Sequence, residues 1–331
     1  MKKYSSSLLA LMLLLLIGCE REINLEHLRP DPKLVMNCLA IEGDTLSVEL
    51  TRTWFYADND VKDICVTGAD VKLYVNDVFR EQLAEVPVRY DNMEYDVVTY
   101  KSFSYFPATG DRIRLVASKS GFKDAEAVTE VPRPCSVSDI QLVQEIKRDT
   151  SRWEYRSYIF VSQANVMRFT LHDEPGVENY YLIYFRRENA SEGYSWSSFT
   201  PDYGKEPLFA IQHSALDIML GYDGVGGYNG LAFTDELIDG KSYQFNIPWN
   251  KSYSYDEGEE YHPDIYHCYL YSVSRSYYNY MKTMQELYDS GFTGDLAESG
   301  FAEPIRIYSN VEGGTGILGG ACLEYNTFVS Q

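Results

Sequence analysis

The chain has 331 residues, of which 49 are acidic and 29 are basic, so its formal net charge is −20 and its pI is about 4.6. A surface this acidic repels the phosphates of nucleic acids and anionic lipid headgroups, which removes both from the expected partners. The length suits two domains of ordinary size.

The first nineteen residues have the pattern of a lipoprotein signal. Lys2 and Lys3 precede an apolar run over 8–17 that is too short to span a bilayer. The run ends in Leu-Ile-Gly-Cys, a lipobox, where signal peptidase II cuts before the cysteine. We therefore expect residues 1–18 to be removed and Cys19 to carry acyl chains such as palmitate. Residues 19–32 are charged and contain two prolines, so they are expected to form a tether.

Alternating apolar and polar residues predict β-strands from residue 33 onward. The alternation occurs in three runs, 46–51, 71–75 and 112–117, and turn residues lie at Gly43-Asp44, Asn76-Asp77 and Thr109-Gly110-Asp111. Short strands at this spacing favour an antiparallel immunoglobulin-like β-sandwich. Pro132 and Pro134 end the pattern, so the first domain is predicted to span 33–134.

Residues 135–331 are predicted to form a second, larger β-rich domain. Strands are expected at 167–172, 180–185, 243–247, 266–273 and 305–308. One amphipathic helix is predicted over 275–288, with Ser274 as its N-cap. Tyr277, Met281, Met284 and Tyr288 recur along one face of this helix and are expected to pack on the core. The predicted class is therefore all-β with one packed helix.

The sequence contains no motif that assigns a catalytic, metal or cofactor site. Residues 314–319 spell G-x-G-x-x-G, but only twelve residues follow, too few for the crossover unit of a dinucleotide-binding site. This stretch is expected instead to supply tight bends before a last strand. No G-x-S-x-G is present, and no two carboxylates stand out as a glycosidase pair. The acidic run 256–260 is typical of a solvated loop, with a calcium site as the less favoured interpretation. We expect a protein without enzymatic activity, a hydrolase being the less favoured alternative.

Aromatic residues are the remaining signal, with 29 tyrosines, 15 phenylalanines and 4 tryptophans. Core packing explains most of them, because tyrosine suits strands. A separate cluster lies in a stretch with glycine, serine and proline that is typical of an exposed loop, and it comprises Tyr194, Trp196, Phe199 and Tyr203. Exposed aromatic rings on a loop can stack on sugars or contact proteins. These four residues are the candidate ligand-binding site.

Five cysteines remain once Cys19 is lipidated: Cys38, Cys65, Cys135, Cys268 and Cys322. An odd number leaves at least one thiol without an intramolecular partner, and no C-x-x-C pair indicates a zinc site. Two interpretations stay open outside the cytoplasm: a disulfide between Cys268 and Cys322, or small buried thiols.

Three stretches of the chain resemble a family of Bacteroidetes lipoproteins known as domain of unknown function 4249. The stretches are Lys33 to Asn37 at the first strand, Phe233-Thr234-Asp235 through Asp239-Gly240 to Tyr243, and the closing segment with Ser272-Val273-Ser274, Tyr277 to Tyr280, Glu303-Pro304 and Ser309 to Ile317. The resemblance implies an outer-membrane lipoprotein of the kind often encoded beside TonB-dependent receptors. It supplies no catalytic residues. Glu20-Arg21-Glu22 also resembles the export signals of surface lipoproteins.

These observations give three functional expectations. The first is a non-enzymatic accessory subunit of a TonB-dependent nutrient uptake system, lipid-anchored in the outer membrane, at the cell surface or on the periplasmic face. The second is a lipoprotein that binds a glycan or peptide by itself through the aromatic loop. The third, least favoured, is the hydrolase. The expected partners are the lipid bilayer, a TonB-dependent receptor and a glycan or peptide ligand, but not nucleic acid.

Overall fold

The computed structural model describes residues 26–55, 58, 64–88, 97–153, 156–189, 195–198, 201–209, 230–256, 263–288, 294, 296–297, 301 and 303–330. Within them the chain forms sixteen strands in three sheets, so the all-β class is confirmed. The strands are β1 (Leu34–Ile41), β2 (Ser47–Arg52), β3 (Asp70–Val75), β4 (Val78–Gln82), β5 (Ala84–Val88), β6 (Val97–Lys101), β7 (Arg112–Ser118), β8 (Ala125–Glu130), β9 (Ser136–Trp153), β10 (Arg156–His172), β11 (Tyr180–Asn189), β12 (Ser195–Ser198), β13 (Leu231–Thr234), β14 (Ser242–Asp256), β15 (Ile265–Val273) and β16 (Thr315–Val329). The helices are η1 (Glu26–Leu28), η3 (Tyr203–Lys205), η4 (Pro207–Phe209) and α3 (Arg275–Tyr288).

The first half of the chain forms a β-sandwich. Strands β1, β2, β6 and β5 belong to one sheet, and β4, β3, β7 and β8 form the other, in that order. The apolar members of the alternating runs face each other between the sheets, and Leu50, Leu73 and Leu115 are fully buried there. The predicted sandwich is therefore confirmed, whereas its immunoglobulin type and the boundary at residue 134 stay predictions.

The C-terminal strand β16 connects the two halves of the molecule. It pairs in parallel with β1, from Val35 opposite Thr315 to Ile41 opposite Ala321, and antiparallel with β15 on its other side. The nine-stranded sheet runs in the order β12-β11-β15-β16-β1-β2-β6-β5, with β13 paired to β11. Residues at both ends of the sequence thus share one sheet, and Leu318 of β16 is buried in the core of the sandwich.

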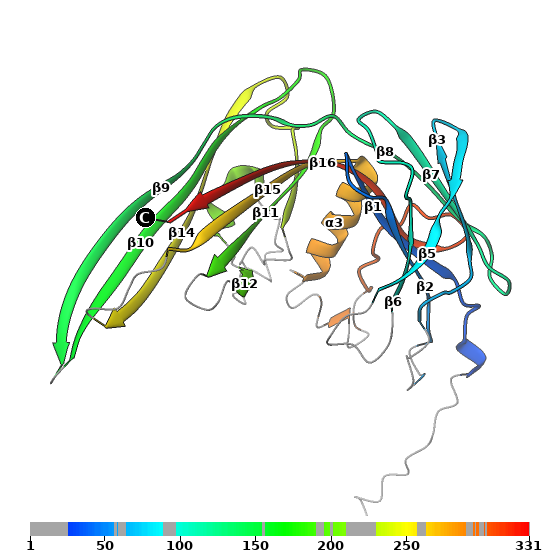
Figure 1. The fold of residues 1–331 in the computed structure, drawn as a ribbon, viewed down its shortest axis with the longest axis horizontal. Coiled ribbons are helices and arrows are strands. Elements are labelled where there is room, and N and C mark those ends of the chain that lie inside the picture. Colours follow the sequence, from blue (N-terminus) through cyan, green and yellow to red (C-terminus); the bar gives the residue numbers. More distant parts are fainter. Residues whose placement is uncertain are drawn as a thin grey trace, which may run out of the picture.

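The second half has a core on each face of the β11–β15–β16 sheet. On one face, β9, β10 and β14 form a separate three-stranded sheet whose Phe169 and Phe245 rings stack at 4.6 Å inside a core with Ile183 and Leu270. On the other face, α3 packs through Met281 against a smaller cluster. Figure 1 shows an arch, with the long three-stranded sheet as one leg, the sandwich as the other, and α3 between them below β16.

The helix predicted over 275–288 is confirmed. The hydroxyl of Ser274 accepts the Tyr277 N–H at 3.4 Å, as expected of an N-cap, and also the N–H of Gly320 in β16 at 3.0 Å. The predicted core face is only partly right, because Met281 and Gln285 are the buried residues while Tyr288 is 64% exposed. The strand expected at 305–308 does not form; the Tyr308 N–H instead donates to the Thr283 hydroxyl of α3 at 3.0 Å.

All five described cysteines are free thiols. Cys322 pairs in register with Ser272, which lies four residues from Cys268 on the same strand. At about 3.4 Å per residue this separates the two cysteines by roughly 13 Å, too far for a disulfide. The structure thus favours the buried-thiol interpretation over a Cys268–Cys322 bridge.

We expect only Cys65 to react rapidly with a thiol reagent at pH 8 in the native mature protein. Burial raises the pKa of Cys38, Cys135 and Cys322 to about 12 and also raises the pKa of Cys268, so their reactive thiolates are scarce. Unfolding in guanidinium without reductant should expose five thiols in the lipidated protein, measured with a chromogenic disulfide. A total of three would indicate a disulfide and contradict the prediction.

Candidate functional site

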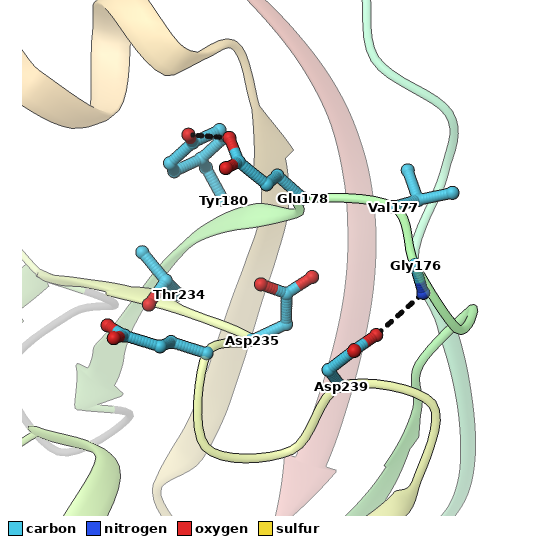
Figure 2. A pocket seen from close by; sticks show the side chains of 8 residues that line it. Gly176, Val177, Glu178, Tyr180, Thr234, Asp235 and Asp239 are labelled. Carbon is cyan, nitrogen blue, oxygen red and sulfur yellow. Dashed lines mark hydrogen bonds between the residues drawn. The ribbon is translucent and has the colours of Figure 1, made fainter.

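A cavity of about 450 Å³ lies between two loops at the end of the β11–β13 pair. One loop precedes β11 and contributes Gly176, Val177 and Glu178, while the other follows β13 and contributes Asp235 and Asp239. Figure 2 shows these side chains around the opening, together with Tyr180 at the first position of β11. The lining is acidic, so the cavity favours ligand groups that donate hydrogen bonds.

The carboxylates of this region fasten the two loops to each other. Asp235 accepts the backbone N–H of Asn179 at 2.7 Å, and Asp239 accepts that of Gly176 at 2.7 Å (Figure 2). From the opposite loop, Asp173 accepts the N–H of Gly240 at 2.8 Å. Charge-assisted hydrogen bonds to backbone donors are strong, so these three acids act as structural links.

Tyr180 and Glu178 of the cavity bind each other. The Tyr180 hydroxyl donates to Glu178 at 2.8 Å, and burial together with this bond raises the pKa of Tyr180 to about 12. The pKa of Asp235 is also raised, because the effect of burial outweighs the opposite effect of the hydrogen bonds from Asn179. Within the part of the chain that the structure describes, no group of His, Cys, Asp and Glu is arranged to hold a metal ion. The cavity therefore lies at a junction where hydrogen bonds join two loops.

A second candidate is a row of tyrosines on the face of the sheet that carries α3. Tyr184 stacks on Tyr269 with ring centroids 4.4 Å apart, and Tyr269 lies 4.9 Å from Tyr325, so the row crosses β11, β15 and β16. We call these three residues the tyrosine row. Tyr325 is 45% exposed and the other two are half-buried, so the row lies partly open beyond α3.

A buried histidine fixes the outer end of the tyrosine row. His267 Nδ1 and the Tyr325 hydroxyl lie 2.5 Å apart, and His267 Nε2 lies 3.4 Å from a carboxylate oxygen of Glu188. These contacts hold the Tyr325 ring in one orientation at the surface. An oriented, partly exposed tyrosine is suited to contact with a protein, because its ring is apolar while its hydroxyl stays in water.

The structure describes only two of the four residues of the predicted aromatic loop, Trp196 by its backbone alone and Tyr203 in full. Tyr203 is only 4% exposed and packs against Phe185 and Phe209, so the expectation of an exposed ring is wrong for this residue. Trp196 lies in β12, where its backbone pairs in register with Glu188 of β11. Its side chain, Tyr194 and Phe199 lie outside the described residues, as do Cys19 and most of the acidic run 256–260.

The two later motifs of the sequence have clear structural roles. In the central motif, Asp235 and Asp239 form the loop links described above. In the closing motif, Asn310 connects the sandwich to β16, because its amide donates to the carbonyls of Val128 and Leu318 at 3.1 and 2.9 Å and accepts the Leu318 N–H at 2.9 Å. The motifs thus specify how the sheets are joined.

The family profile described as Domain of unknown function (DUF4249) matches residues 20–322, which contain both motifs. The chain belongs to the DUF4249 family. No curated protein matches its sequence. Among solved structures, it is similar to a candidate membrane-anchored protein from Corynebacterium diphtheriae, at 12% identity and a TM-score of 0.18. That similarity covers 75% of this chain and 56% of the other, so the chain spans little more than half of its structural neighbour.

No helix among the described residues is both long and apolar enough to cross a bilayer. The tyrosine row was missed at the level of sequence, although Tyr269 and Tyr271 alternate along β15. Their cross-strand partners Tyr184 and Tyr325 come from distant segments, and no local pattern identifies such pairs.

Proposed function

We propose that this DUF4249 protein is a lipid-anchored outer-membrane protein that acts as a non-enzymatic accessory subunit of a TonB-dependent nutrient uptake system. The lipobox ending at Cys19 is the observation that carries the proposal. Glu26, the first described residue, follows only seven positions later, so the anchor leads almost directly into the β domain. Several acyl chains on one residue give stable attachment, which a single chain does not.

The tyrosine row supports a role in protein contact. Interfaces between proteins are enriched in tyrosine, and their most important residues are often aromatic rings held in place by neighbours. Tyr325 fits this description, since His267 orients its hydroxyl and Leu323 beside it on the same face is also exposed. A transporter could therefore bind the open part of this sheet beyond α3.

The engaged carboxylates support a role without catalysis. A general acid or base must reach the substrate proton, and a carboxylate that holds backbone donors is poorly placed for that. Asp235 and Asp239, two of the four acids that line the cavity, both accept backbone N–H groups of the opposite loop.

Purification of the tagged native protein from gently solubilised outer membrane tests the proposal. We expect a TonB-dependent receptor at equal stoichiometry by mass spectrometry, and loss of that receptor from the Tyr325→Ala variant. Phe103→Ala is the matched control, because Phe103 is a highly exposed aromatic residue just after β6, a strand that β1 and β2 separate from β16. A protein recovered alone, or equal recovery of the receptor with Tyr325→Ala, would contradict the proposed contact.

A second candidate function is binding of a glycan or peptide by this sheet without a transporter. The position of β12 favours it, because this strand places the backbone of Trp196 at the edge of the sheet beside β11. A glycan and peptide array probed with the wild type and with Trp196→Ala separates the two. Binding lost with Trp196→Ala supports this function, whereas unchanged binding excludes Trp196 as the site.

A further inference from the structure

The last part of the predicted tether, residues 29–32, and the following Lys33 are bound to the residues just after β2. The Arg29 guanidinium forms two hydrogen bonds with Asp58, at 2.6 and 2.9 Å, and lies 4.7 Å from the centre of the Phe55 ring. The Lys33 N–H donates to the Thr53 hydroxyl at 3.0 Å, and the Thr53 N–H donates to the Lys33 carbonyl at 2.9 Å. Residues 29–33, 53–55 and 58 therefore form one structural unit at this end of the sandwich.

This unit exposes apolar side chains. Leu28 is 56% exposed and Trp54 is 54% exposed, and Pro30 and Pro32 are exposed as well. We call these four residues the tether patch. Trp54 lies between Thr53 and Phe55, the two residues that contact the Arg29–Lys33 segment, so the four residues belong to the same end of the sandwich. A large exposed tryptophan indicates a contact surface more strongly than a scattered aliphatic residue does.

The length of the tether limits where the patch can be. Glu26 lies seven residues after Cys19, and a fully extended chain spans at most about 3.6 Å per residue, so the two are separated by at most roughly 25 Å. The acyl chains on Cys19 lie in the bilayer, and η1 therefore stays close to the membrane surface. In Figure 1, η1 is the short blue coil at the end of the sandwich.

The geometry points to a membrane contact: we propose that the tether patch rests on the leaflet that holds the acyl chains, so that the protein stands on the membrane in one orientation. This inference rests on the lipid anchor of the proposed function. Tryptophan favours the boundary between headgroups and acyl chains, and the exposed Lys33 beside it suits lipid phosphates. The net charge of −20 opposes recruitment by anionic lipids, so the contact suits a zwitterionic surface.

Quenching of tryptophan fluorescence by brominated lipid tests this contact. The full-length lipidated protein is reconstituted into phosphatidylcholine vesicles with or without bromine on the acyl chains, and flotation reports attachment. We expect lower emission in the brominated vesicles, and loss of most of this quenching with Trp54→Phe. Trp249→Phe is the matched control, since Trp249 is buried in the second core and should contribute no quenching.

Flotation and quenching separate the two proposals. A protein that does not float lacks the anchor, which overturns both. A protein that floats but is quenched equally with Trp54→Phe, or is not quenched at all, keeps its anchor and overturns the membrane contact alone. If Trp54 is unquenched and Trp54→Ser also lowers recovery of the receptor from outer membrane, the patch faces a protein, which likewise overturns the membrane contact.

Discussion

Replacing Cys19 with alanine is expected to move the protein almost completely from the membrane fraction to the soluble fraction. One C14 acyl chain alone gives a membrane binding constant on the order of 10⁴ M⁻¹, and stable attachment needs a second chain or signal. The tether patch adds only a few apolar side chains, too few to replace the lipid. The variant should be secreted behind a signal that leaves no apolar run attached, and the fractions compared after ultracentrifugation.

The same variant should keep its fold, because residue 19 precedes every described element. Its unfolding midpoint in guanidinium should match that of the lipidated protein. Cys65→Ala is the control for the loss of a thiol, since Cys65 lies in the folded part and that variant should stay with the membrane. Continued pelleting of Cys19→Ala with membranes would contradict the lipid anchor and with it the tether-patch contact.

The sequence predicts those parts of this fold that depend on local pattern. The alternation around Leu46, Val48 and Leu50 corresponds to fully buried side chains at and just before β2. Asn76 and Asp77, predicted as a turn, have φ of 52° and 66° and join β3 to β4. Asparagine and aspartate tolerate positive φ, which two-residue hairpin turns require, so this information lies within four residues of sequence.

The pairing of β16 with β1 is not available from local pattern. Ala40 opposes Gly320 in a parallel register, 280 positions away in sequence. The sequence predicts that the glycines near the C-terminus supply bends before a last strand, yet Gly316, Gly319 and Gly320 lie within β16 itself. A Cβ on Gly320 would stand 2.2 Å from the Glu130 carbonyl oxygen, and one on Gly316 would stand 2.3 Å from that of Met36. Only the assembled sheets reveal this requirement.

The candidate site was predicted less well than the fold, for a similar reason. Glycine, serine and proline predict an exposed loop over 194–203, yet residues 195–198 form strand β12. They also do not reveal that the Tyr203 ring, at the start of η3, packs against Phe185 and Phe209. The tyrosine row needs three strands in register before its members meet. The composition therefore predicts that aromatic residues form the candidate site, whereas tertiary packing determines which tyrosines are exposed.

Substitution of Gly313 by alanine is expected to destabilise the protein by roughly 2–5 kcal/mol. Gly313 has φ of +74°, and a Cβ there would lie 2.1 Å from the Asp124 carbonyl oxygen. To avoid that contact, the residues around Gly313 would have to move away from β8. Such movement would break the paired backbone hydrogen bonds between Glu312 and Glu126, at 2.7 and 2.9 Å. The loss should appear as a lower guanidinium midpoint.

Gly43→Ala provides a control that separates backbone strain from the steric contact. Gly43 has the same φ of +74°, but a Cβ there would meet nothing within 4 Å. Its substitution should therefore cost only the strain of the left-handed conformation, about 1–2 kcal/mol. The additional destabilisation by Gly313→Ala, compared with Gly43→Ala, measures how strongly the closing motif holds the chain against β8. If the two substitutions lowered the free energy of unfolding equally, the Asp124 carbonyl could move aside without destabilising the protein. The closing motif would then not be needed for close packing between Gly313 and the residues before β8.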